Sequence, residues 1–285
     1  MVDHPLARTL ARARRLNEYL KPELGPPGGE GWIAAADLTP GAALLEALIA
    51  ATQARLRTKA AAIVASAILQ SYQWPLVSTA VACYLLDRRV PDLRPASTRT
   101  RFTAEHAADA LALLGGRFSA LASDPAAGHP DATVVPDLAA LRTALRAQLE
   151  AHLGGVIDRL CASLGCKPRG LWLNVADSLA GTLVWLRQHQ ATTLGQLEAE
   201  LAALIHTPGS PLAGSRTGLI QLSHQARSQV FVERTTCCYW YRTEGGEYCS
   251  TCPHRTPEDR SEQLLAYLAE EPPQQPGAAQ EEVPA

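Results

Sequence analysis

Four of the 7 cysteines in this 285-residue chain lie close together near its C-terminal end, in the stretch CCYWYRTEGGEYCSTC. They are Cys237, Cys238, Cys249 and Cys252, and their spacing is C-C-x10-C-x2-C. Cysteine sulfurs bind zinc, hold iron–sulfur clusters, exchange thiols with disulfides or close structural disulfides. The type and spacing of these residues therefore indicate a site of sulfur chemistry.

Two of these chemistries, structural zinc and thiol exchange, fit the spacing less well than an iron–sulfur cluster does. A structural zinc site gathers four thiolates at one tetrahedral point, usually from two C-x2–4-C turns, whereas Cys237 and Cys238 are adjacent. Neighbouring side chains of an extended strand point to opposite faces, so both could reach one ion only in a bent loop. Thiol exchange needs an activated C-x-x-C pair in a βαβ setting, which is missing. A [2Fe–2S] cluster spreads four thiolates over two irons and tolerates unusual spacing better.

The residues around the cysteines agree with a negatively charged cluster. The intervening YWYRTEGGEY fits a β-hairpin, in which Gly245 and Gly246 supply the positive φ of a tight turn. Such a turn would bring the first two cysteines back toward the last two. The basic residues that flank the cysteines are Arg234, Arg242, His254 and Arg255. Their charge would offset that of the thiolates.

The rest of the chain predicts a mainly α fold, because Ala and Leu dominate the apolar residues and favour helix packing over sheet. We expect a multi-helical domain with a few short β-strands and a small C-terminal iron–sulfur-binding hairpin region. Helical periodicity covers residues 40–74, 76–86, 104–114, 136–165, 170–189, 194–206 and 257–271. Short strands are predicted at residues 97–102, 218–223 and 228–241.

Several local signals set the expected ends of these elements. Thr39 and Pro40 suit the N-cap and the first position of a helix, and Pro75 should break or restart the helix in which it lies. Gly154 and Gly155 should interrupt the helix at 136–165, and residues 22–31 read as a Pro/Gly linker. We divide the chain into a helical domain at 1–206, a [2Fe–2S]-binding region at 207–271 and a disordered tail at 272–285.

Charge and hydropathy exclude some classes of protein. A net charge of −2 argues against a general nucleic-acid binder. No apolar run reaches the roughly 18 residues that a membrane span requires, and the N-terminus lacks the apolar core of a secretory signal. We therefore predict a cytoplasmic protein, in which thiols stay reduced. The Arg-rich first helix either packs on the domain or makes a peripheral membrane contact.

The cysteine motif resembles that of a known family. RTTCCYWYRTEGGEYCSTCP is similar to the C-terminal motif of the FhuF-type ferric-siderophore reductases, which hold a [2Fe–2S] cluster with C-C-x10-C-x2-C. Upstream, SYQWPLVSTAVACYLL (71–86) and RGLWLNVADSLAGTL (169–183) resemble helical landmarks of the family. The chain departs from the family pattern at 93–136, where an alanine-rich run stands in place of clearer strands.

The resemblance implies an oxidoreductase that reduces a ferric siderophore, with the hydroxamate type favoured, by one electron and releases Fe(II) in the cytoplasm. It implies that Cys237, Cys238, Cys249 and Cys252 hold the cluster, and that no catalytic residue is needed beyond it. A ferredoxin or a flavin reductase would supply electrons, since no G-x-G-x-x-G follows a strand. Two alternatives stay open: an electron-transfer module for another partner, and an interaction protein with a four-cysteine zinc knuckle.

The other cysteines and one tryptophan complete the candidate residues. Cys83, Cys161 and Cys166 lie in apolar helical patterns, where cysteine behaves as a small hydrophobic residue, and we expect them in the core. Trp240, two residues after Cys238, is a candidate for contact with the cluster or its substrate.

Overall fold

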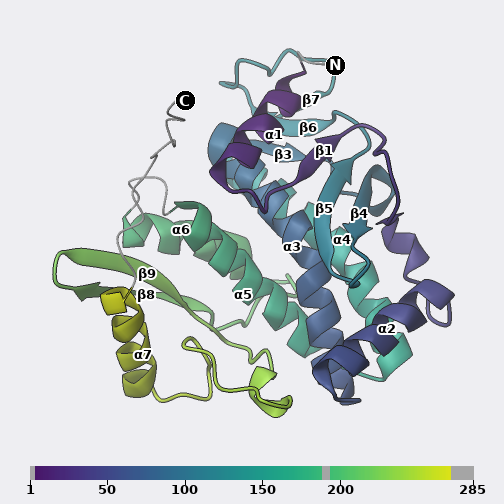
Figure 1. Cartoon of the computed structure of the whole chain (residues 1–285). Helices are drawn as coiled ribbons and strands as arrows, with labels where there is room; N and C mark the ends of the chain where they lie inside the picture. Colours follow the sequence, from purple (N-terminus) through teal and green to yellow (C-terminus); the bar gives the residue numbers. More distant parts are fainter. Residues whose placement is uncertain (1–3, 188–192, 271–285) are drawn as a thin grey trace, which may run out of the picture.

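The computed structural model describes residues 4–187 and 193–270 and confirms the mainly α fold class (Figure 1). The helices of the described part are α1 (Pro5–Leu16), α2 (Ala43–Leu56), α3 (Ala61–Asp87), α4 (Leu138–Leu164), α5 (Pro168–Arg187), α6 (Leu194–Ile205) and α7 (Pro257–Glu270). Short strands form three small sheets beside them. The predicted C-terminal helix is confirmed as α7, and residues 272–285 lie outside the described part.

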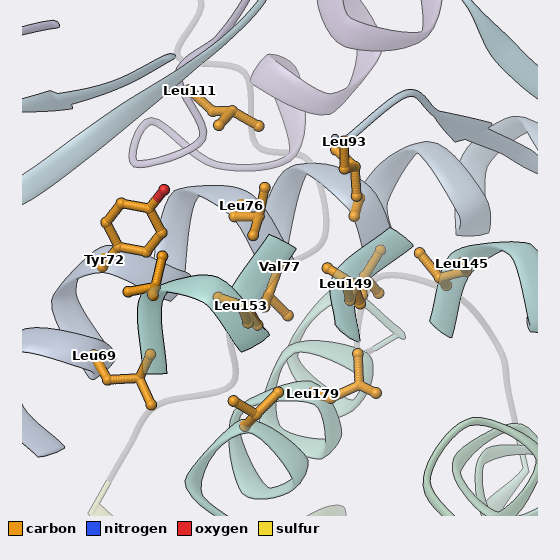
Figure 2. Packing of buried hydrophobic residues seen from close by; sticks show 14 of the residues in the cluster. Leu69, Tyr72, Leu76, Val77, Leu93, Leu111, Leu145, Leu149, Leu153 and Leu179 are labelled. Carbon is orange, nitrogen blue, oxygen red and sulfur yellow. The ribbon is translucent and has the colours of Figure 1, made fainter. Parts of the chain in front are cut away.

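Helices α3, α4 and α5 pack against one another and form the centre of the molecule. On α4, Leu145, Leu149 and Leu153 recur at four-residue steps, so they share one face of the helix and are buried together. Figure 2 shows this face against Leu76 and Val77 of α3. Each of these three helices packs an apolar stripe against the other two. This packing explains why the long Ala/Leu-rich segments fold as helices.

Three predicted helix boundaries are wrong. Helix α3 continues through Pro75, although proline has no N–H to donate, because the residues on both sides of it are buried in the core. Helix α4 also continues through Gly154 and Gly155, and the Trp172 ring of α5 packs beside Gly154.

The start of α2 differs from the prediction as well. Its N-cap is Ala42, so the helix begins after the predicted Thr39 and Pro40. The Thr39 hydroxyl donates instead to the carbonyl oxygen of Ala36, at 2.7 Å, and is therefore engaged in the preceding turn.

Two sheets cover the core on the side of α1 (Figure 1). One has the order β1-β5-β4-β2 and the other the order β3-β6-β7. Their strands are β1 (Pro22–Leu24), β2 (Trp32–Ile33), β3 (Arg89–Pro91), β4 (Thr98–Phe102), β5 (Ala108–Leu113), β6 (Phe118–Leu121) and β7 (Ala132–Val135). The strand predicted at 97–102 is confirmed as β4, whereas the linker predicted at 22–31 contains β1 and pairs with β5.

The helix predicted at 104–114 is wrong, because this segment forms β5. It lies between β1 and β4, and most of its residues are buried, so its Ala/Leu pattern does not alternate. Helix propensity yields here to backbone pairing on both edges. The alanine-rich run at 93–136 therefore does contain strands, β4 to β7.

Helix α1 places Leu6, Leu10 and Ala13 in the main core, so its apolar face is used for packing. Among the described residues, no single helix is long and apolar enough to cross a membrane. Helices α2 and α3 meet that criterion only when taken together, and a bend of 108° separates them.

The C-terminal part adds a hairpin and a small core of its own. Strands β8 (Gly218–His224) and β9 (Arg227–Glu233) pair antiparallel, as predicted for short strands in this region. Phe231 of β9 packs with Leu264 and Leu268 of α7 in a cluster separate from the main core. Whether the chain divides at the proposed domain boundaries stays a prediction.

A buried polar chain crosses the main core. The Nδ1 of His152 lies 2.6 Å from the Leu93 carbonyl oxygen, and its Nε2 lies 2.7 Å from the Tyr72 hydroxyl. Burial lowers the pKa of His152, so the ring is neutral and has one donor and one acceptor. Its Nδ1–H donates to Leu93 and its Nε2 accepts from Tyr72, which satisfies both ring nitrogens.

We predict that Tyr72→Phe lowers the free energy of unfolding by about 1–3 kcal/mol, because Nε2 of His152 would stay buried without a donor. Urea unfolding followed by circular dichroism measures this change. Tyr19→Phe is the control, since Tyr19 is exposed and its substitution should have little effect. Equal stability of the two variants would contradict the prediction.

Candidate functional site

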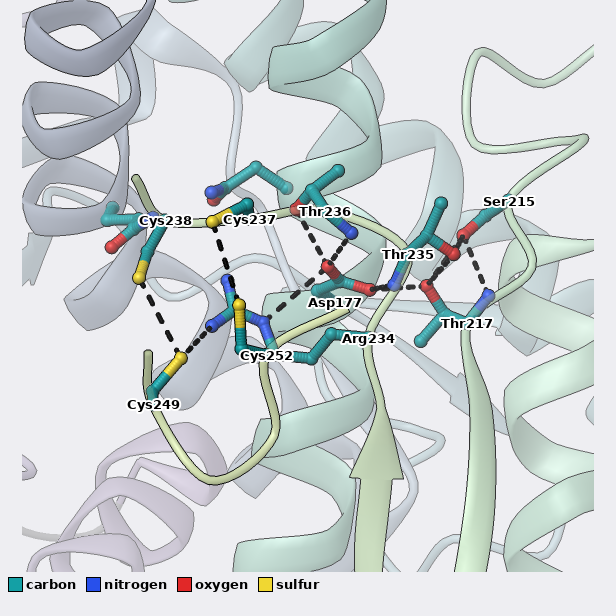
Figure 3. Close-up of polar contacts among 12 residues, drawn as sticks. Asp177, Ser215, Thr217, Arg234, Thr235, Thr236, Cys237, Cys238, Cys249 and Cys252 are labelled. Carbon is teal, nitrogen blue, oxygen red and sulfur yellow. Dashed lines mark hydrogen bonds and ion pairs between the residues drawn. The ribbon is translucent and has the colours of Figure 1, made fainter. Parts of the chain in front are cut away.

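The four cysteines of the C-terminal motif come together in the loop that follows β9 (Figure 3). We call residues 234–255 the cysteine loop. Its sulfurs form two pairs: Sγ of Cys237 lies 3.9 Å from that of Cys252, and Sγ of Cys238 lies 4.0 Å from that of Cys249. Two sulfurs bound at about 2.3 Å to one tetrahedral metal ion lie about 3.8 Å apart. Each pair is therefore spaced like two ligands of one metal ion.

The two sulfur pairs do not merge into a single tetrahedron. Over residues 4–187 and 193–270, no three cysteine sulfurs lie within 4.8 Å of one another. One zinc ion would bring all four sulfurs to about 3.8 Å from each other. The donor set thus suits two metal ions with two thiolates each, as in a [2Fe–2S] cluster, better than a zinc knuckle.

The cysteine loop is bent where the sequence predicted a hairpin. No strand forms between Cys238 and Cys249; Tyr239 has a left-handed φ of 60°, and the short 3₁₀ helix η3 (Trp240–Arg242) follows it. The hairpin prediction is therefore wrong. The bend at Tyr239 removes the difficulty of two adjacent cysteines, since their side chains are no longer held on opposite faces of a strand.

The glycine pair does return the chain, but of the two only Gly245 has the predicted positive φ. Gly245 has a φ of 71°, which favours glycine. A Cβ on Gly246 would lie 1.9 Å from the Trp240 carbonyl oxygen, so no other residue fits there without moving the backbone. The two glycines bring Cys249 back to Cys238 by a tight turn rather than by strand pairing.

A buried carboxylate on α5 holds the beginning of the cysteine loop. Asp177 is 6% exposed and accepts hydrogen bonds from the backbone N–H groups of Thr235 and Thr236, at 2.9 and 2.8 Å. The hydroxyls of Thr236 and Thr217 also donate to it, at 2.7 and 2.5 Å. Hydrogen bonds to an ionised acceptor are among the strongest that a side chain makes. Asp177 thereby fixes the backbone directly before Cys237.

Sequence reasoning missed Asp177. The signal that could have found it is a single acid within the otherwise apolar run of α5, LNVADSLAGTL, where an unpaired carboxylate would be costly to bury. Its partners lie 40 to 59 residues away along the chain, so spacing does not reveal them.

Arg234 links the carboxylate to the sulfurs. Its Nε lies 3.7 Å from Asp177, and its Nη1 lies 3.9 Å from Sγ of Cys249. Burial alone would lower the pKa of Arg234, but Asp177 and the nearby cysteines raise it overall, so the guanidinium stays charged. The predicted role of this residue, to offset the charge of the thiolates, agrees with its position.

The other basic residues of the motif lie farther from the sulfurs. Arg255 donates to the carbonyl oxygens of Tyr248 and Cys249, at 2.8 and 3.0 Å, and so supports the loop backbone. The ring of His254 lies beside Tyr248, and Arg242 ends η3. Their predicted electrostatic role is indirect at most, because their contacts are with the loop and not with sulfur.

The thiols of one sulfur pair differ strongly in acidity. The Cys249 thiol donates to Cys238, and with Arg234 beside it this lowers the pKa of Cys238 to about 5. The same hydrogen bond raises the pKa of Cys249. In the other pair, burial raises the pKa of Cys237 to about 11. One sulfur is thus ready to bind a metal as thiolate, and others release protons on binding.

The remaining candidates lie outside this pairing. Trp240 is 48% exposed on η3. Cys83 is fully buried in α3, as predicted, and burial raises its pKa to about 12. Cys161 and Cys166, which we predicted in the core, are only half-buried; they flank the turn between α4 and α5, where no apolar layer covers them completely.

Comparison with known families decides between the interpretations. The model of the FhuF 2Fe-2S C-terminal domain matches residues 234–254, and that of the ferric iron reductase FhuF-like transporter family matches residues 66–208. The chain belongs to the FhuF-like ferric iron reductase family. No curated protein matches it. The resemblance in the cysteine motif is confirmed, and the cofactor of this FhuF-like protein is a [2Fe–2S] cluster.

The two matched segments meet at the carboxylate described above. Asp177 lies in the larger segment and its partners Thr235 and Thr236 lie in the smaller one. The Asp177 side chain thus joins the helical body of this FhuF-like protein to the start of its cysteine loop.

We predict that Asp177→Asn causes the protein to lose most of its cluster while the helices stay folded. The amide keeps one acceptor but turns a donor toward Thr236, and each lost hydrogen bond to a charged group is worth about 1.5–3 kcal/mol. Iron and acid-labile sulfide analysis, with far-UV circular dichroism, measures both effects. Asp109→Asn, at a half-exposed ion pair with Arg101, is the control. Full iron content in Asp177→Asn would refute the anchoring role.

Proposed function

We propose that this FhuF-like protein is a ferric-siderophore reductase, in which two sulfur pairs hold a [2Fe–2S] cluster. Cys237 and Cys252 would bind one iron, and Cys238 and Cys249 the other. The observation that carries the proposal is the spacing within the two pairs, 3.9 and 4.0 Å, together with their separation from each other. When bound, such a cluster supplies one-electron transfer.

The substrate chemistry is consistent with this donor set. Hydroxamate and catecholate oxygens are hard ligands that hold Fe(III) tightly, and they hold the softer Fe(II) less well. Adding one electron to a ferric chelate therefore weakens the chelate and lets iron leave as Fe(II). The reaction needs no proton transfer or covalent nucleophile. The chain therefore only has to hold the chelate near the sulfurs.

A hollow beside the cysteine loop is a suitable place for part of the chelate. It has a volume of about 270 Å³ and lies between α5 and β9. Gly181, Val184 and Trp185 form its wall on α5, and residues 229–232 form its wall on β9. Arg234 and Thr251 of the cysteine loop also line it, so the hollow borders the site of the sulfurs.

The charges of the hollow favour a hydroxamate over a catecholate. Its charged lining residues among those described are Asp177 and Arg234, which face each other and leave little net charge. Three hydroxamates neutralise Fe(III), whereas three catecholates leave the chelate strongly anionic. An anionic chelate would be repelled by the thiolates without a compensating cation, and desolvating it would be costly.

The proposed setting is the cytoplasm, where Fe(II) can be used and thiols stay reduced. A ferredoxin or a flavin reductase would reduce the cluster again after each reaction. An electron-transfer module without a siderophore substrate remains the competing function, and the experiments below separate the two.

The test of the proposal is anaerobic mixing of the reduced protein with ferric chelates. We expect a ferric trihydroxamate to reoxidise the protein and to yield Fe(II), trapped by a ferrous chelator, faster than a ferric tris-catecholate does. If the protein carries iron and sulfide but no ferric chelate reoxidises it, the electron-transfer module is favoured. If it carries zinc without sulfide, the proposal is wrong.

We predict that Cys249→Ser abolishes the visible absorption and the EPR signal of the reduced protein, since it removes one thiolate of a pair. Most of the helical circular dichroism should remain, because the cysteine loop contributes little to the main core. Cys83→Ser is the matched control: it removes a thiol that is buried in α3, away from the loop. Unchanged spectra in Cys249→Ser would remove that residue from the ligand set.

We predict that Gly181→Leu raises the KM for a ferric trihydroxamate by about tenfold, equivalent to roughly 1.4 kcal/mol, because the new side chain fills part of the hollow. A Cβ on Gly181 meets no atom within 4 Å, so the helix should tolerate the change. Gly170→Leu is the control, at an exposed position of α5 where a Cβ also meets no atom within 4 Å. The visible spectrum should stay the same in both. An unchanged KM in Gly181→Leu would place the substrate elsewhere.

A further inference from the structure

The turn between α4 and α5 holds a second pair of cysteines, which the cluster does not use. Cys161 lies in the last turn of α4, and Cys166 lies two residues before Pro168, the first residue of α5. Gly165 ends α4 with a left-handed φ of 68°, and its N–H donates to the Cys161 carbonyl oxygen at 2.8 Å. This reversal of the chain brings Cys166 back over the last turn of α4.

The two sulfurs lie next to each other. Sγ of Cys161 is 3.0 Å from Sγ of Cys166, about 1 Å more than the bond length of a disulfide, and both residues are half-buried. They are closer than the sulfurs within either pair of the cysteine loop, at 3.9 and 4.0 Å. At 3.0 Å the two sulfurs are in direct contact, with no space for a metal ion between them.

We propose that Cys161 and Cys166 are a redox-active dithiol, which an oxidant of the peroxide class closes to a disulfide across the turn between α4 and α5. This inference goes beyond the proposed reductase function and stands or falls independently of it. It rests on the contact of the two sulfurs, on their partial exposure and on the turn that holds them together.

The two thiols have different roles in the reaction. Burial and the contact with Cys166 raise the pKa of Cys161 to about 12, so Cys161 keeps its proton and can donate it to the sulfur of Cys166. The Cys166 sulfur attacks one peroxide oxygen and the O–O bond breaks; the leaving oxygen takes the proton of the Cys166 thiol and departs as water, which leaves a sulfenic acid on Cys166. Cys161 then attacks the Cys166 sulfur and the S–O bond breaks; the leaving hydroxyl takes the proton of the Cys161 thiol and departs as a second water. Two thiols are oxidised by two electrons, and one hydrogen peroxide is reduced to two waters.

The position of the pair gives the disulfide a structural consequence. It would tie the last turn of α4 to the segment that enters α5, the helix that carries Asp177. Closing the bond restricts the unfolded chain, so the oxidised protein should unfold at a higher temperature than the reduced one. Partial burial of both sulfurs favours a small oxidant over a bulky one.

Trypsin separates this pair from the other cysteines, which makes a direct test possible. Residues 160–169 form one peptide with both Cys161 and Cys166, because the Lys167–Pro168 bond resists cleavage. The cysteine-loop thiols fall in peptides 235–242 and 243–255, and Cys83 in peptide 60–88. The cluster-loaded protein is treated with hydrogen peroxide, blocked with iodoacetamide, digested and analysed by mass spectrometry.

We expect peptide 160–169 to lose two hydrogens and to take up no alkyl group, and dithiothreitol to restore both reactive thiols. Oxidised glutathione, a bulkier oxidant, should form the same bond more slowly. The rise in unfolding temperature after peroxide should be absent in Cys161→Ser and present in Cys83→Ser, in which the dithiol is intact.

Three results would overturn the proposal. In the first, both thiols of peptide 160–169 are still alkylated after peroxide has oxidised exposed thiols of a reference peptide. In the second, Cys161 or Cys166 accumulates as sulfinic acid without a disulfide. In the third, either cysteine is found linked to a peptide of the cysteine loop. None of these outcomes depends on ferric reduction, so failure of the dithiol and failure of the reductase function are distinguishable.

Discussion

The hydrogen bonds of one buried carboxylate hold the candidate site together. Asp177 sits on α5 with its side chain in the protein interior, and an ionised carboxylate there is tolerated only when it is fully hydrogen-bonded. The donors come from Thr217, Thr235 and Thr236. Because the buried carboxylate needs these hydrogen bonds, it determines where the cysteine loop begins. A loop with little regular structure is thereby fixed to α5, which packs in the main core.

Charge balance follows from the same contact. Arg234 lies between Asp177 and the sulfur of Cys249, so the acid keeps the guanidinium charged and the guanidinium offsets the thiolates. The pair also lines the adjoining hollow, where the two opposite charges largely cancel. Anchoring of the cysteine loop and charge compensation beside the sulfurs are thus consequences of one arrangement, and a change in Asp177 would affect both.

The elements that the sequence did not predict share a cause. Strand β5 has a helical Ala/Leu pattern, yet it pairs with strands on both edges, and Pro75 stays inside α3 because the buried residues around it outweigh one missing hydrogen bond. In the same way, the loop between Cys238 and Cys249 satisfied a hairpin pattern, but its backbone turns at Tyr239 instead. For β5 and Pro75 a local preference gave way to contacts made with distant residues.

The sequence by itself determined the kind of chemistry, because the identity and spacing of four cysteines restrict the site to a few sulfur-bound cofactors. It also determined the dominance of helices, through the periodicity of apolar residues. Only the tertiary structure decided which sulfurs pair, that Asp177 anchors them and that Cys161 meets Cys166. The physical reason is that spacing limits which atoms can meet, whereas their actual distances depend on how the backbone bends and on which buried polar groups must be satisfied.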